Sequence, residues 1–128
     1  MRLLLDTCTF LWVVTDPSKL SLIARDAFSD PGNAVYLSAI SAWEISVKHR
    51  AGRLPLPEPP DRLIPAMRDA HGVTELPLSE AAALTEWKLP PLHRDPIDRM
   101  LVCQAIVDGL MIVTPDTAVQ QYPVRTLW

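Results

Sequence analysis

The feature that most constrains the fold is a series of short apolar segments separated by helical patterns. Candidate strands are "LLL" before Asp6, "AVYLS" at 34–38, "VTEL" at 73–76, "LMIVT" at 110–114 and "VRTLW" at the end. Short, nearly continuous apolar runs are typical of strands buried on both faces of a parallel sheet. The alternation of strand and helix therefore predicts an α/β fold, with a mostly parallel central sheet and helices on both faces.

Capping residues and glycines predict where the helices begin and end. We expect one helix directly after Asp6, one capped by Ser18 or Ser21, and one over 38–52 that ends at Gly52. Asp61 is expected to cap a helix that runs to about residue 71, and Ser79 a short helix. The segment 97–109 predicts an apolar helix closed by a glycine, and 117–122 about one helical turn.

Composition indicates one globular domain over residues 1–128, with 48% hydrophobic and 21% charged residues. The net charge of −3 argues against a protein that coats nucleic acid through a broad basic face. Cys8 and Cys103 lie in apolar helical patterns, which favours reduced thiols in a cytoplasmic protein over a disulfide. We expect neither a signal peptide nor a membrane span.

Four carboxylates fall where ligands bind in parallel sheets, at the carboxyl ends of the strands. Asp6 ends the first strand and Asp116 follows the "LMIVT" strand, while Glu44 and Asp98 lie in helices among apolar neighbours. Carboxylates that converge on one crevice repel each other unless they are protonated or bind a divalent cation. Oxygen ligands favour Mg²⁺ or Mn²⁺ over Zn²⁺, and such ions suit phosphodiester hydrolysis.

Each carboxylate also has a purely structural interpretation, which the sequence leaves open. Asp6 and Asp116 can cap the helices that follow them, and Asp98 can interact with the helix dipole from a first turn. Glu44 can pair with Lys48 four residues later. Only their joint occurrence at matching positions favours a metal site.

The chain resembles the PIN-domain ribonucleases of the VapC toxin type. The resemblance rests on "LLLDTCTFLW", "LSAISAWEISVKHRAGRL", "LPPLHRDPIDRMLVCQA" and "LMIVTPDTAVQQY", which follow the order of that family's LLLDTH-, SxxSxWEI-, HxDPFDR- and TxD-type motifs. It implies a three-layer α/β/α sandwich and an endoribonuclease dependent on Mg²⁺ or Mn²⁺. It also implies a cognate VapB-type antitoxin as partner, a homodimer, and a higher assembly with the antitoxin.

Carried over by position, the family's acidic residues are Asp6, Glu44, Asp98 and Asp116, of which the three aspartates would be the metal ligands. Asp95 is the nearest competitor of Asp98 and is expected to cap or support the apolar helix that follows. The resemblance gives Thr7 and Thr114 as hydroxyls beside the site. Two positions depart from the motifs without removing a carboxylate: Cys8 replaces a histidine, and Ile97 a phenylalanine.

Basic and aromatic residues near the motifs have two interpretations each. Lys48, Arg50 and Arg53 suit contact with RNA phosphates or the solvated end of a helix, and Arg99 suits either RNA or a carboxylate partner. For His93 a simple hydrogen bond is favoured over metal binding or proton transfer. Trp12 and Trp43 are expected in the core, whereas Trp87 is a candidate for contact with a partner.

The main hypothesis is thus a toxin endoribonuclease that cleaves RNA at an acidic metal site. One alternative is a metal-dependent phosphatase or DNA nuclease, although haloacid-dehalogenase-like phosphatases have a second aspartate where this chain has Cys8. Another is a non-catalytic module that acts with a DNA-binding partner.

Overall fold

The computed structural model describes residues 1–128 and contains one five-stranded sheet. The strands are β1 (Arg2–Leu5), β2 (Ala34–Ser38), β3 (Val73–Leu76), β4 (Met111–Val113) and β5 (Thr126–Leu127). They lie in the order β3-β2-β1-β4-β5, and every neighbouring pair is parallel. The predicted parallel sheet is confirmed, with each strand at its expected place in the sequence.

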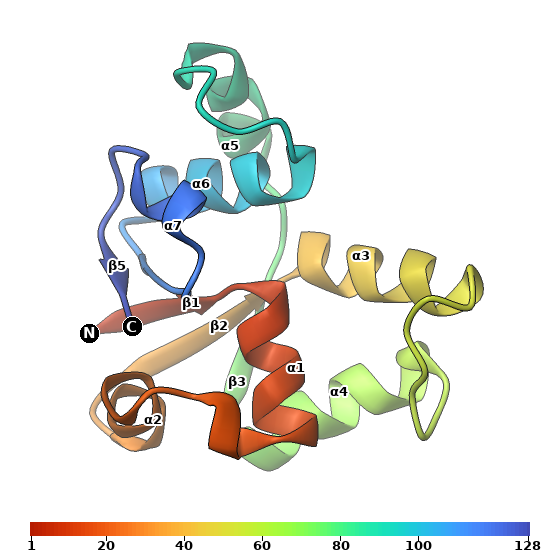
Figure 1. Ribbon diagram of the computed structural model, residues 1–128. Helices are drawn as coiled ribbons and strands as arrows, with labels where there is room; N and C mark the ends of the chain where they lie inside the picture. Colours follow the sequence, from red (N-terminus) through yellow and green to blue (C-terminus); the bar gives the residue numbers. More distant parts are fainter.

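Seven α-helices and two short 3₁₀ turns connect the strands. They are α1 (Thr7–Thr15), η1 (Pro17–Lys19), α2 (Leu22–Ser29), α3 (Ala39–Arg50), α4 (Pro60–His71), α5 (Glu80–Thr85), η2 (Glu86–Lys88), α6 (Pro96–Asp108) and α7 (Thr117–Gln120). Figure 1 shows α5, α6 and α7 on one face of the sheet and α1, α2 and α4 on the other. This arrangement is the expected three-layer sandwich. Helix α3 runs outward from the carboxyl end of β2, away from the sheet.

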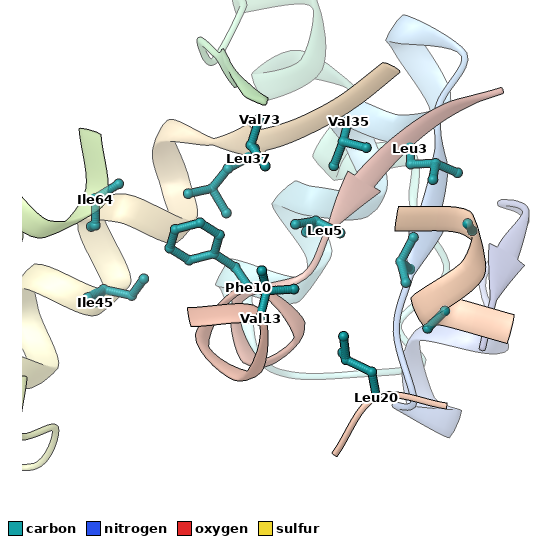
Figure 2. Packing of buried hydrophobic residues seen from close by; sticks show 13 residues of the cluster. Leu3, Leu5, Phe10, Val13, Leu20, Val35, Leu37, Ile45, Ile64 and Val73 are labelled. Carbon is teal, nitrogen blue, oxygen red and sulfur yellow. The ribbon is translucent and has the colours of Figure 1, made fainter. Parts of the chain in front are cut away.

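The two apolar clusters follow from the alternation of side chains along β1. Leu3 and Leu5 point to the cluster under α1, α2 and α4, and Leu4 points to the cluster under α5, α6 and α7. All three leucines are fully buried, which contributes about 2 kcal/mol for each side chain. Figure 2 shows Phe10 and Val13 of α1 in the first cluster with Leu5.

The strand order creates a topological switch point between β1 and β4. The chain builds outward from β1 through β2 to β3, then crosses the sheet to add β4 and β5 on the other side of β1. Ligands bind in α/β proteins in the crevice outside the carboxyl ends of such strands. Asp6 and Asp116 follow β1 and β4 and therefore lie at this crevice.

Most predicted helix ends are confirmed. Ser21 and Ser79 accept hydrogen bonds from the backbone of the helices they cap, and Gly109 closes α6 with a φ of 67°. The prediction for Asp61 is wrong: α4 begins one residue earlier, at Pro60. Proline has no N–H to satisfy and its φ is already helical, so it suits the first position of a helix, which moves Asp61 into the first turn.

The prediction that Trp43 is a core residue is also wrong, because its side chain is 59% exposed. Helix α3 leaves the sheet, so only Ser41 and Ile45 are buried along its length. Trp12 does pack against the first apolar cluster, and its ring lies 5.8 Å from that of Trp128. None of the helices combines the length and apolar character that crossing a membrane would require.

Candidate active site

An open cleft of about 220 Å³ lies at the switch point. Side chains of α1, α3 and α6 meet there with those of residues that follow β1 and β4 and that precede α6. The lining residues are Asp6, Thr7, Cys8, Leu11, Glu44, Lys48, Asp95, Asp98 and Asp116. All four carboxylates predicted for the site thus line one cavity, although they are separated in the chain by up to 110 residues.

Asp6 is 5% exposed and caps helix α1. One carboxylate oxygen, Oδ1, accepts hydrogen bonds from the backbone N–H of Thr9 at 2.8 Å and from the thiol of Cys8 at 3.3 Å. Its own N–H donates to the carbonyl of Val113 at the end of β4. Both strands of the switch point therefore fix Asp6, and Oδ2 has no protein partner. Asp6 thus both caps α1 and lines the cleft.

Asp116 occupies the equivalent position after β4. Its Oδ1 accepts a hydrogen bond of 2.8 Å from the N–H of Ala118, so it caps α7. The buried hydroxyl of Thr114 accepts a hydrogen bond from the Asp116 N–H at 3.0 Å. Thr114 thus holds the backbone of Asp116, which is the supporting role expected of it.

Asp98 lies in the first turn of α6 and pairs with His93. The His93 Nε2 is 3.0 Å from Asp98 Oδ2. Burial raises the pKa of Asp98 to about 6, the hydrogen bond from His93 opposes that rise, and the negative charges of Asp95 and Asp116 add to it. The negative charge of Asp98 is therefore costly to maintain without a nearby cation.

Glu44 faces the cleft from the second turn of α3. Its Oε2 forms an ion pair of 3.0 Å with Lys48, and its side chain is only 12% exposed. Glu44 thus forms the i,i+4 ion pair with Lys48 that the sequence allowed, while both residues line the cleft. Lys48 brings the cleft a positive charge that partly compensates the four carboxylates.

Two further residues support the acidic side chains. The Thr7 hydroxyl donates a hydrogen bond of 2.9 Å to the Ser41 hydroxyl. This bond connects α1 to α3 beside Asp6 and Glu44. Asp95 caps α6 by accepting a hydrogen bond from the N–H of Ile97, as expected, and it lines the cleft as well.

Cys8 is an unreactive neighbour of Asp6 in this geometry. Burial first, and then the charge and hydrogen bond of Asp6, raise the pKa of the thiol to about 12. A thiol rather than a thiolate therefore faces the cleft at neutral pH, and it acts as a weak hydrogen-bond donor.

The predicted basic residues divide into two groups. Lys48, Arg50 and Arg53 are exposed along or just after α3. Arg99 differs, because its side chain is 12% exposed and forms an ion pair with Glu86 at 2.8 Å. It also donates to the Pro90 carbonyl and to the Tyr122 hydroxyl. Contact between Arg99 and RNA is not supported by this geometry, which favours the carboxylate-partner interpretation.

The donor set of the cleft fits a divalent cation. One ligand atom from each of His93, Asp98 and Asp116 lies within 4.8 Å of the others. Carboxylate oxygens are the ligands that Mg²⁺ and Mn²⁺ prefer, and an imidazole nitrogen is compatible with Mn²⁺ more than with Mg²⁺. Asp6 opens on the same cleft with one oxygen free of protein partners.

His93 makes the simple hydrogen bond that the sequence favoured for it. Its hydrogen bond falls on a predicted metal ligand, so it lies in the site in either role. The available signal was its spacing, five residues before Asp98 across the start of a helix.

Comparison with known proteins identifies the family. Residues 3–124 match the PIN domain family. The chain belongs to the PIN-domain family. Over 57 residues it is also 39% identical to ribonuclease VapC16 of Mycobacterium tuberculosis, a segment that covers 44% of this chain and 40% of that relative.

Solved structures share the fold of this PIN-domain protein. VapBC2 of Rickettsia felis, solved bound to a promoter DNA fragment, matches with a TM-score of 0.70 and 14% identity over 98% of this chain and 97% of that one. DNA-bound VapBC of Salmonella typhimurium matches with a TM-score of 0.68 and 18% identity, covering 98% and 96%. At these identities the similarity establishes the PIN fold alone.

Proposed function

We propose that this PIN-domain protein is the toxin of a type II toxin–antitoxin system and a metal-dependent endoribonuclease. The observation that carries the proposal is the convergence of Asp6, Glu44, Asp98 and Asp116 in one cleft at the switch point of a PIN fold. The similarity to a relative named as a ribonuclease supports RNA as substrate. The whole of residues 1–128 forms one catalytic unit in this proposal, which acts in the cytoplasm.

Asp6, Asp98 and Asp116 would hold one or two Mg²⁺ or Mn²⁺ ions, with Glu44 completing the acidic set and His93 beside it. When bound, such ions activate water and neutralise charge on the phosphodiester. The side chains that would hold those ions are themselves fixed: backbone N–H groups hold Asp6 and Asp116, and His93 holds Asp98. Lys48, Arg50 and Arg53 would contact RNA phosphates along α3.

Two partners accompany this function. A VapB-type antitoxin would inhibit the toxin, a proposal supported by the structural similarity to chains solved as VapBC complexes. A homodimer, and a higher assembly with the antitoxin, complete the proposed organisation. The cleft is acidic and open, so a basic antitoxin segment would complement its charge.

The alternatives receive less support from the site. A phosphatase of the haloacid-dehalogenase kind would have a carboxylate at Cys8, where a neutral thiol faces the cleft. A non-catalytic module would have no need of three ligand atoms within 4.8 Å of one another. A DNA nuclease would use the same acidic cleft, and parallel DNA substrates therefore belong in the test.

The test is cleavage of total RNA and matched DNA by the wild-type protein and by Asp6→Asn, with Mg²⁺, Mn²⁺ or EDTA. Asn keeps an oxygen that can cap α1 but lacks the charge, so the fold should persist. We expect products with 5′-phosphate and 3′-hydroxyl ends, no cleavage in EDTA, and a loss of about 10²–10³ in kcat for the variant. Full activity of Asp6→Asn would exclude this mechanism.

A further inference from the structure

Helix α3 presents two side-chain rows beside each other near its exposed end. Glu44 and Lys48 form one row and line the acidic cleft. Trp43 and Val47 form the neighbouring row, because each precedes one of those residues by one position. With Arg50 and Ala51 they line a surface depression. The helix therefore places a large aromatic surface next to the candidate catalytic cleft.

A second hollow, of about 160 Å³, lies between α3 and the start of α6. Its walls are formed by Trp43, Glu44, Val47, Lys48, Arg53 and Ile97. Glu44 and Lys48 also line the acidic cleft, so the two cavities share a wall. A polymer that binds across the acidic cleft can thus place its adjacent monomer in this hollow.

The exposure and charge of this hollow are those of a nucleic-acid site. Trp43 is 59% exposed and Val47 is 44% exposed. Arg53 lines the hollow, and Arg50 lies in the adjoining depression that Trp43 also lines. Both arginines are exposed, and neither makes an ion pair or a side-chain hydrogen bond with the protein. Glu44 is the only carboxylate of the hollow, and Lys48 already pairs with it. An aromatic face beside free arginines complements a base with its phosphates.

We propose that Trp43 is a stacking platform for an unpaired base next to the scissile phosphate, while Arg50 and Arg53 contact the phosphates that flank this base. The inference rests on the proposed ribonuclease function and assigns to Trp43 a role in holding its substrate. Only an unpaired nucleotide can lay its base on a side chain, because base faces inside a duplex are covered by their neighbours. Loss of Trp43 should therefore weaken the binding of unpaired RNA and leave the binding of a paired stem unchanged.

Binding of a fluorescein-labelled single-stranded RNA and of a hairpin with a fully paired stem tests this inference, in EDTA so that no cleavage occurs. For Trp43→Ala we expect affinity for the single strand to fall about ten-fold or more, and affinity for the paired stem to stay the same. Trp43→Phe should keep most of the affinity, since phenylalanine retains an aromatic face. Trp87→Ala is the matched control, because Trp87 is 77% exposed and lines neither cavity.

An abasic nucleotide gives the sharper test of stacking. With Mn²⁺ present, replacing the base next to the mapped cut by an abasic site should slow the wild-type protein and leave Trp43→Ala unaffected, because the variant has no stacking to lose. Equal binding of single strands by Trp43→Ala and wild type would overturn the inference. So would a changed oligomeric state of Trp43→Ala in light scattering, which would assign this face to a protein contact.

The outcomes separate the inference from the proposed function. If the wild-type protein cleaves RNA and Asp6→Asn does not, while Trp43→Ala matches the wild type in every assay, only the stacking inference fails. If the wild-type protein cleaves no RNA in Mg²⁺ or Mn²⁺, the proposed function fails whatever the result for Trp43.

Discussion

The four carboxylates of the cleft fall into two pairs that are held in different ways. Asp6 follows β1 directly and Asp116 is the third residue after β4, and backbone N–H groups of the helices they cap hold one oxygen of each. Glu44 and Asp98 lie inside helices, and the partners of their carboxylates are side chains, Lys48 and His93. One half of the cleft is thus built by the main chain and the other half by side chains.

The pair held by the backbone is rigid, whereas the pair held by side chains can change its contacts. The sheet sets the positions of Asp6 and Asp116, and their free oxygens need no rearrangement to meet a cation. Glu44 and Asp98 can exchange their contacts with Lys48 and His93 for contacts with a cation. We expect substitutions on the side-chain half to change ion binding and charge while leaving the fold intact.

The largest effect on this half is expected for His93. Replacing His93 by alanine removes the hydrogen bond to Asp98 and one candidate ligand atom, so the affinity for Mn²⁺ should fall about 10–100-fold in titration calorimetry. His93→Gln should restore part of the affinity if the hydrogen bond dominates, because glutamine can also donate to Asp98.

His71→Ala is a suitable control for the His93 variants. His71 lies in the last turn of α4, near the ring of Phe28 and outside the cleft. Its replacement should leave Mn²⁺ affinity unchanged. An unaltered dissociation constant for His93→Ala would mean that His93 has no part in the metal site.

Asp98→Asn is expected to stabilise the protein in a pH-dependent way. The folded protein raises the pKa of Asp98 to about 6, so the folded state binds its proton more tightly than the unfolded chain does. Stability is therefore lost as pH rises from about 4 to about 6, and the full cost persists above that range. Replacing the carboxylate by an amide removes this cost, so the variant should be more stable by about 3 kcal/mol at neutral pH.

Thermal unfolding in EDTA at several pH values measures this effect. The Tm of Asp98→Asn should exceed that of the wild type by several degrees at pH about 7.5, and the difference should vanish near pH 4. Mn²⁺ should raise the Tm of the wild type more than that of the variant, because the variant has lost a ligand. A variant less stable than the wild type at neutral pH would contradict the assignment of a burial cost to Asp98.

The backbone-held pair is the part of the site that local sequence could predict. An aspartate directly after a buried apolar strand both caps the next helix and reaches the edge where ligands bind, so Asp6 and Asp116 are placed by strand positions alone. The sheet topology follows from the same strands. Glu44 and Asp98 have a weaker local signal, which is an acidic residue among apolar neighbours in a helix, and the four motifs agree with that choice.

The remaining features depend on contacts between distant segments. Trp43 was expected in the core because its neighbours are apolar, but α3 leaves the sheet and gives that residue nothing to pack against. Arg99 turns away from the cleft because Glu86 and Tyr122, distant in the chain, form its binding pocket. Neither outcome follows from periodicity, since each depends on where another helix lies.

The smallest effect is expected for the ion pair between Glu44 and Lys48. The Lys48 side chain is 46% exposed, so solvent screens the pair, and an i,i+4 pair of this kind contributes about 0.2–0.5 kcal/mol. A double-mutant cycle of Glu44→Gln and Lys48→Met, followed by urea unfolding in EDTA, should give a coupling energy in that range. A coupling well above about 1 kcal/mol would instead mean that Lys48 holds Glu44 as firmly as the backbone holds Asp6, and the division of the cleft into a rigid and an adaptable half would fail.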